Sequence, residues 1–212
     1  MIPVNKLHHE FKLSVDKVDS LNSPNFLPNE IDALLWRGIK KWFLDTVKLN
    51  ESHSEITNKL MPFRVLKEVV AFTNNNGVYE VDLTNLQGTF HTVTKLEVTI
   101  SKNGCEKTCT SYHMRDNDLD TKYNDPSYDW CRVPYKTGSG STPTYLYLYT
   151  DNDFTISEIR LSYLKLPNEP FFGGYNSLNG IYTSTNPTSV DSDIDDIYLN
   201  EIINYTLQEI RI

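Results

Sequence analysis

The sequence is poor in the features that mark several common protein classes. No apolar run approaches the roughly 18 residues that a membrane-spanning helix needs. The first residues, MIPVNKLHHEFKL, lack the basic start and the apolar core of a secretory signal. Basic residues are in deficit, with 20 Lys and Arg against 28 Asp and Glu and a formal net charge of −8, which disfavours ordinary binding to nucleic-acid phosphates. We therefore expect a protein that is made and used in a cytoplasm and does not contact a membrane.

Cysteine is scarce as well. Three cysteines leave one unpaired in any disulfide scheme, so we expect free thiols in a reducing compartment. With one histidine they form the only metal-ligand set that the sequence suggests: Cys105, Cys109, His113 and Cys131. A second C-x2-C pair is missing, so thiols without a metal are the favoured interpretation, and no cofactor is expected.

Signatures of catalysis are missing too. There is no GxSxG elbow, no HExxH helix and no Gly-rich phosphate loop. Asp116, Asp118 and Asp120 match the first positions of a calcium loop, but Thr121 and Ser127 stand where that loop needs Gly and Glu. Paired carboxylates of a hydrolase stay open as an alternative, because any two can meet in a fold. The sequence favours a protein that is not an enzyme.

The first 60 residues have the pattern of amphipathic helices. Leu7, Phe11 and Val15 recur at helical spacing, and a second helix is expected from Pro28. Its broad apolar stripe consists of Ile31, Leu34, Leu35, Ile39, Trp42, Phe43 and Val47. Gly38 lies in this stripe, where a missing side chain lets another backbone approach closely. A shorter helix is expected over Ser52–Leu60.

The middle of the chain has the pattern of strands. Residues 78–83, 93–100, 144–150 and 156–164 are rich in β-branched and aromatic residues. Asn-Gly pairs at 76–77 and 103–104 predict tight turns, the second of them a hairpin. In TYLYLYT, Tyr145, Tyr147 and Tyr149 alternate with leucines, which places the tyrosines on one face. That face is expected to be half-covered, or else to form a subunit contact or a sugar-stacking surface.

The chain ends in a polar loop, 173–190, and a strongly amphipathic helix with Ser192 or Asp193 as the expected N-cap. The predicted fold class is α+β, with N-terminal helices and a C-terminal helix packed with a mostly antiparallel β-rich portion. We expect one structural unit made of a helical portion at 1–64, a β-rich portion at 65–170 and a loop with a helix at 171–212. The β-rich portion is expected to contain a loop insertion, rich in Cys and Asp, at about 105–140.

Three stretches resemble the head–tail connector proteins of tailed bacteriophages, which are adaptor, gatekeeper or neck-ring proteins beneath the portal: LPNEIDALLWRGIKKWFLDTV, IRLSYLKLPNEPF and VDSDIDDIYLNEIINYTLQEI. The chain is most similar to the ring proteins of short-tailed, crAss-like phages. The resemblance implies a non-enzymatic virion protein of the neck or tail, assembled in the host bacterial cytoplasm as a ring, often a dodecamer. Its implied partners are the portal protein and neighbouring ring proteins, and genomic DNA passes the channel without specific binding.

Under this interpretation, aromatic and apolar side chains contact sister subunits. The candidates are Trp36, Trp42, Phe43, Tyr145, Tyr147, Tyr149, Tyr175, Tyr182, Ile197, Tyr198 and Tyr205. For the first three, core packing is the favoured alternative. The alternative function is a carbohydrate-binding β module on a phage fibre or a cell surface, with the tyrosines as stacking platforms.

Overall fold

The structure is a computed structural model that describes residues 1–18, 26–50, 57–114, 125–138, 144–174 and 188–210. Its internal contacts divide the chain into two compact units. Met1–Pro62 and Pro167–Ile212 form the first, called the helical unit below, and Phe63–Leu166 form the second, the β unit. The β unit is one continuous stretch of chain, whereas the helical unit combines the two ends.

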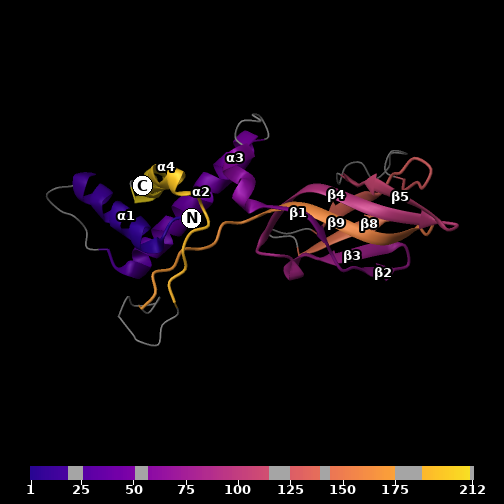
Figure 1. Cartoon of the computed structure of the whole chain (residues 1–212), viewed down its shortest axis with the longest axis horizontal. Helices are drawn as coiled ribbons and strands as arrows, with labels where there is room; N and C mark the ends of the chain where they lie inside the picture. Colours follow the sequence, from indigo (N-terminus) through magenta and orange to yellow (C-terminus); the bar gives the residue numbers. More distant parts are fainter. Residues whose placement is uncertain (19–25, 51–56, 115–124, 139–143, 175–187, 211–212) are drawn as a thin grey trace. The chain divides into compact units, whose positions relative to one another are not determined.

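Three helices build the core of the helical unit: α1 (Val4–Val18), α2 (Pro28–Asn50) and α4 (Leu199–Ile210). α4 packs against both α1 and α2 (Figure 1). The predicted apolar positions line this core, since Leu7 and Phe11 of α1 and Leu35 and Ile39 of α2 are buried. The apolar stripe of an amphipathic helix becomes part of the core when a partner helix covers it. The short helix expected from Ser52 is described only as α3 (Thr57–Leu60), because 51–56 lie outside the described residues.

At Gly38, α2 lies close to the backbone of α4. A Cβ at this position would lie 2.2 Å from Oγ1 of Thr206 and 2.8 Å from its backbone nitrogen. Thr206 is buried in α4, and its hydroxyl donates a hydrogen bond to the carbonyl of Ile202 at 2.9 Å. The prediction that Gly38 admits another backbone is therefore confirmed, and the partner is α4.

The two ends of the chain are joined within the helical unit. Ile2 and Ser192 form an antiparallel bridge with hydrogen bonds of 3.0 and 3.1 Å. The Asp191 carboxylate accepts a hydrogen bond from the backbone N–H of Val4 at 2.9 Å. An acidic residue near the end of the sequence thus caps the first helix, where a negative charge is favourable.

The expected N-cap of the last helix, Ser192 or Asp193, is wrong. Asp195 takes that role, because its Oδ1 accepts from the N–H of Ile197 at 3.1 Å where the 3-10 turn η5 (Asp196–Tyr198) leads into α4. Ser192 is bridged to Ile2, and Asp193 accepts from the N–H of Asn168 at 3.0 Å. Partners far away in the sequence, which no local pattern reveals, engage these two residues.

Two sheets form the β unit. The first is antiparallel, with the order β1 (Arg64–Val69), β9 (Thr155–Lys165), β4 (Phe90–Lys102) and β5 (Cys105–Thr110). The second has the order β2 (Thr73–Asn75), β3 (Val78–Asp82), β8 (Tyr145–Tyr149), β7 (Pro134–Thr137) and β6 (Tyr112–His113), with only β6 and β7 parallel among these pairs. Short 3-10 turns lie at η2 (Met61–Phe63) and η3 (Leu83–Asn85).

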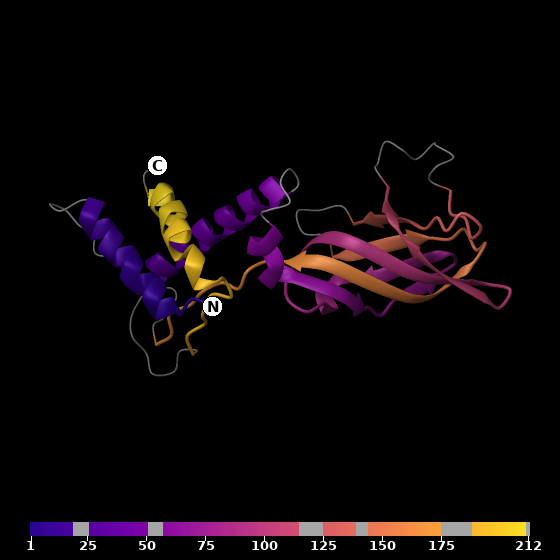
Figure 2. The same ribbon diagram turned by 45° about the horizontal axis from the view of Figure 1, so that its top comes forward.

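The two sheets share one hydrophobic core, which makes the β unit a two-layer sandwich (Figure 2). Val98 and Leu161 of the first sheet and Val81 and Leu148 of the second are at most 1% exposed. Side chains of successive strand residues point to opposite faces, so each strand contributes alternate residues to the core. The sandwich therefore buries one face of each sheet and leaves the other face outward.

Both Asn-Gly pairs form two-residue turns between paired strands. In the first, Asn76 and Gly77 have φ of 52° and 88° between the partners Asn75 and Val78. In the second, Asn103 and Gly104 have φ of 53° and 81°, and β4 and β5 form the expected hairpin. Asn and Gly tolerate positive φ, which turns of this type require.

The predicted α+β fold class is confirmed by these helices and antiparallel-rich sheets. We expected one structural unit; the observed division into two units instead groups the first and last portions in one core. The expected loop insertion at about 105–140 contains β5, β6 and β7 within its described residues, which corrects that expectation. The reason is non-local, because β7 is held by pairing with β8.

Candidate subunit interface

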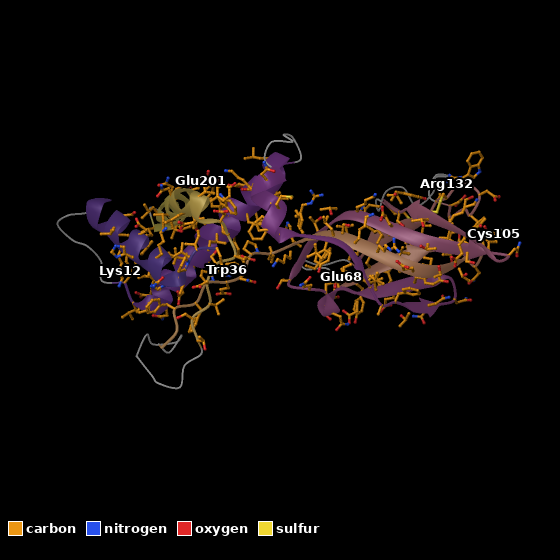
Figure 3. All side chains as sticks on the ribbon, viewed as in Figure 1. Lys12, Trp36, Glu68, Cys105, Arg132 and Glu201 are labelled. Carbon is orange, nitrogen blue, oxygen red and sulfur yellow. A yellow bond between two sulfur atoms is a disulfide. The ribbon has the colours of Figure 1, made fainter. Side chains whose placement is uncertain are left out.

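The early aromatic candidates of α2 differ in their exposure. Trp42 and Phe43 are buried in the core of the helical unit, so for these two the alternative of core packing holds and they are removed from the interface candidates. Trp36, labelled in Figure 3, is half-buried. The ammonium of Lys40 lies 4.7 Å from the centre of its ring. The Trp36 ring therefore stays partly accessible beside the positive charge of Lys40, and Trp36 remains an interface candidate.

A polar clamp holds Trp42 in the core. Its indole N–H donates to the carboxylate of Glu201 at 2.9 Å, and the Lys59 ammonium lies 2.7 Å from the same carboxylate. Burial acts to raise the pKa of Glu201, but Lys59 and Trp42 together outweigh burial and hold the pKa below its ordinary value. This clamp joins α2, α3 and α4.

The candidates near the end of the chain lie in η5, with Ile197 and Tyr198, and in α4, with Tyr205. Ile197 is 76% exposed, while Tyr198 is half-buried with its ring 5.6 Å from that of Trp42. Tyr205 is also half-buried, and burial first, then Asp45, raises the pKa of its hydroxyl. Tyr175 and Tyr182 lie outside the described residues. Ile197 is thus the most exposed of these candidates.

The tyrosines of β8 face outward, as the alternation predicted. Leu146 and Leu148 are fully buried between the sheets, whereas Tyr145, Tyr147 and Tyr149 lie on the opposite face. The rings of Tyr145 and Tyr147 are 6.3 Å apart. We call these three residues the tyrosine strip.

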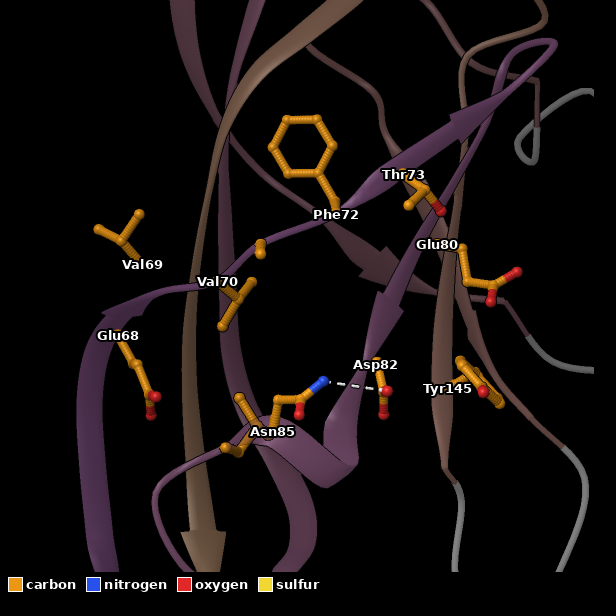
Figure 4. Close-up of a pocket in the computed structure, with 11 residues that line it drawn as sticks. Glu68, Val69, Val70, Phe72, Thr73, Glu80, Asp82, Asn85 and Tyr145 are labelled. Carbon is orange, nitrogen blue, oxygen red and sulfur yellow. Dashed lines mark hydrogen bonds between the residues drawn. The ribbon is translucent and has the colours of Figure 1, made fainter.

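A pocket of about 490 Å³ adjoins the strip at Tyr145. Figure 4 shows Glu68 and Asp82 on opposite sides of this pocket, with Asn85 between them. Hydrogen bonds from the Thr84 side chain and backbone and from Asn85 hold the pKa of Asp82 below its ordinary value, against the effect of burial. The other acidic residue of the lining is Glu80, and Val70, Phe72 and Leu86 supply apolar surface. The pocket combines three carboxylates with an apolar floor.

The edge strand β1 exposes two apolar side chains, of which Val69 lines this pocket. Leu66 and Val69 are 63% and 64% exposed. The pairing of β1 with β9 shifts between Val65 and Glu68, and Lys67 at the shift has φ of 53°. Such a bulge discourages unspecific strand pairing. The edge is therefore apolar but irregular.

The cysteines are paired differently from our expectation. Cys109 and Cys131 form a disulfide with their Cα atoms 5.4 Å apart, and Cys105 is an exposed free thiol. The His113 ring meets the Tyr135 ring edge-on, with 5.2 Å between the two ring centres. Free thiols in a reducing compartment were thus the wrong expectation for two of the three cysteines. Within the described ranges, no group of three or more His, Cys, Asp or Glu residues is placed to hold a metal ion.

One buried polar cluster escaped the sequence analysis. In the helical unit, Nε2 of His8 lies 2.7 Å from the Asp32 carboxylate, which also accepts from the N–H of Phe172 at 3.1 Å. The Phe172 ring stacks on His8 at 4.7 Å. Three distant segments meet here, and this could be found only from the folded chain.

No protein-family model and no curated protein matches this sequence. Among the helices in the described part of the chain, none is long and apolar enough to cross a membrane.

Proposed function

We propose that this protein is a non-enzymatic virion structural protein that forms an oligomeric ring in the portal–neck–tail assembly of a tailed bacteriophage. The ring surrounds the channel through which DNA leaves the particle. Its partners are sister subunits, the portal protein and the adjacent neck or tail ring proteins. It is assembled in the host cytoplasm and needs no cofactor.

The observation that carries the proposal is that both units expose large apolar side chains. Ile197 is 76% exposed on the helical unit, and Leu66 and Val69 are similarly exposed on the edge strand of the β unit. Large apolar groups that are exposed to solvent favour association between copies of a protein. A contact in which one surface of a copy binds a different surface of the next copy is heterologous. A heterologous contact that closes on itself produces a ring.

The tyrosine strip supports the same proposal. Tyrosine is enriched in protein interfaces because it combines a large apolar ring with a hydroxyl. The inner face of β8 already supplies the core with Leu146 and Leu148, so the outer tyrosines are not needed to hold the sandwich together. They are free to contact a neighbouring subunit.

Net charge supports the role around a channel. The formal charge of −8 per chain accumulates when copies assemble. A duct with this charge repels phosphates, so DNA can pass without being retained.

The test is the mass of the purified chain, measured by native mass spectrometry over a range of concentrations. We expect a closed oligomer, and we expect Ile197→Asp to lower the oligomer fraction at least about tenfold, because a charge would be buried in an apolar contact. Asn200→Asp is the matched control, since Asn200 is an exposed residue in the first turn of α4. An unchanged oligomer in Ile197→Asp would remove Ile197 from the interface, and a monomeric wild type that is missing from phage particles would overturn the proposal.

A further inference from the structure

Trp130 of the β unit is displayed to solvent. Its side chain belongs to the largest apolar type, and it is 76% exposed. Tryptophan is highly buried on average, because burying its 150–250 Å² or so is strongly favourable. An indole kept outside needs a reason.

The turn that carries Trp130 is fixed by its own hydrogen bonds. Ser127 and Arg132 exchange two backbone hydrogen bonds of 2.9 Å each, and the N–H of Cys131 donates to the carbonyl of Tyr128 at 3.2 Å. The disulfide then ties Cys131 to Cys109 of β5. Few conformations remain for the backbone at Trp130.

A second anchor holds the same turn at Tyr128. This side chain is buried, and its hydroxyl donates to the carbonyl of Cys105 at 2.9 Å. The Lys107 ammonium lies 4.3 Å from the centre of the Tyr128 ring. Figure 3 shows Arg132 and Cys105, which flank these contacts, at the same end of the β unit. A platform fixed in advance loses little entropy when it binds a ligand.

The surroundings of Trp130 are polar. Asp125 and Asp129 precede it as exposed residues, and Glu106, Lys107 and Thr108 of β5 are also exposed. From 125 to 132 and along β5, no other large hydrophobic side chain is among the exposed ones of the described residues. Among the exposed residues of these described segments, Trp130 is thus the one large apolar side chain, and the others are mostly charged or carry hydroxyl groups.

This composition selects among the usual partners of an exposed tryptophan. Protein hot spots lie in an apolar patch that excludes water, and the described residues of the turn and of β5 expose no large apolar side chain besides Trp130. Nucleic acids and anionic lipid surfaces need excess positive charge. Residues 125–132 and β5 have no such excess, because the basic Lys107 and Arg132 stand against three acidic residues, Asp125, Asp129 and Glu106. A neutral sugar ring fits, because it offers an apolar C–H face to the indole and hydroxyl groups to the carboxylates.

We propose that Trp130, on its disulfide-held turn, is the stacking platform of a binding site for neutral oligosaccharides. The site is separate from the tyrosine strip, which the sequence had suggested for sugar stacking. It goes beyond the ring-forming function, and neither depends on the other. Asp129 and Asp125 are the expected acceptors for sugar hydroxyls.

The test is titration of the full chain with three neutral probes, maltohexaose, cellohexaose and chitohexaose, monitored by the indole N–H signals in NMR spectra. We expect at least one probe to shift the Trp130 signal with a Kd of about 1 mM or tighter. Trp130→Ala should weaken that binding about tenfold or more, while Trp130→Phe should retain part of it. Trp36→Ala, which removes a partly exposed indole of the helical unit, should leave it unchanged.

Three results would overturn the inference. One is a Trp130 signal that none of the probes moves up to their solubility limits. Another is equal sugar affinity in wild type and Trp130→Ala. The third is loss of the oligomer in Trp130→Ala without any sugar binding by the wild type, which would make Trp130 a subunit contact. Native mass spectrometry of the same variant separates this last result from a failure of the ring proposal itself.

Discussion

The helical unit and the β unit are held together in different ways. In the helical unit, helices far apart in the sequence share one apolar core, and single contacts such as Gly38 with Thr206 and Asp191 with the N–H of Val4 position them. In the β unit, long ladders of backbone hydrogen bonds join β4 to β9 and β1 to β9, and a disulfide adds a covalent link. The helical unit should therefore be sensitive to single side chains, whereas the β unit distributes its stability over the backbone.

The largest effect is expected at Gly38 in the helical unit. Gly38→Ala places a methyl group against the backbone of Thr206, at 2.8 Å from its nitrogen, so α2 and α4 must separate. We expect a loss of about 3 kcal/mol in the free energy of unfolding. Urea denaturation measures the loss, and hydrogen exchange should place it in α2 and α4.

The control for this variant is Gly104→Ala in the β4–β5 turn. A Cβ there meets nothing within 4 Å, although φ is +81°. Only backbone strain of about 1 kcal/mol is expected. If Gly38→Ala cost no more than Gly104→Ala, the close approach of α2 and α4 would be wrong.

The next effect is expected at the disulfide of the β unit. In a Cys105→Ser background, which prevents a new pairing, Cys131→Ser opens a loop with a sequence separation of 22 residues. The expected loss is about 3 kcal/mol at most, from the greater chain entropy of the unfolded state. Calorimetry should show a lower melting temperature, and hydrogen exchange should rise at β5 and the Ser127–Arg132 turn while the helical unit is unchanged.

Cys105→Ser alone is the reference for that measurement. Because Cys105 is an exposed free thiol, this substitution should change stability by no more than about 0.5 kcal/mol. Equal melting temperatures for the reference and for the double variant would contradict a disulfide between Cys109 and Cys131.

The smallest effect is expected at Tyr163 in the β unit, and it depends on pH. The buried Tyr163 hydroxyl lies 2.7 Å from the Glu68 carboxylate and 3.0 Å from the carbonyl of Gln87. Burial first, and then Glu68, raises the pKa of Tyr163 above its ordinary value. Tyr163→Phe should cost about 1 kcal/mol at neutral pH through the lost hydrogen bond.

The sign of the pH effect follows from the raised pKa. The folded state holds the Tyr163 proton more tightly than the unfolded state, whose tyrosines titrate near pH 10 or so. The contribution of Tyr163 is fully present below that pH and is lost as pH rises further. The difference in unfolding free energy between wild type and Tyr163→Phe should therefore shrink above about pH 10, and a difference that grows there would contradict the assignment.

Local patterns predicted the elements that depend on local physics. The apolar stripes around Phe11 and Leu35, the Asn103-Gly104 turn and the outward tyrosines of β8 all follow from periodicity or from φ preference. These features could be predicted because each depends only on residues within one helical turn or one pair of strands.

The remaining features depend on which distant segments meet. Cys109 and Cys131 pair because the Ser127–Arg132 turn packs on β5, and no spacing rule shows this. Asp191 caps α1, not its own helix, and Asp32 is buried against His8 from another helix. The exposure of Trp130 could not be predicted either, since an aromatic residue next to a cysteine is as compatible with a core position.

The central claim is that copies of this chain form a ring around the DNA channel of a phage particle. Electron cryo-microscopy of intact particles, with the structures of the two units fitted separately into the map, tests it most directly. We expect both units in a closed ring of the neck or tail, with Ile197 at a contact between adjacent copies. Density in which neither unit fits any ring, together with the absence of the protein from the purified particles, would contradict the claim.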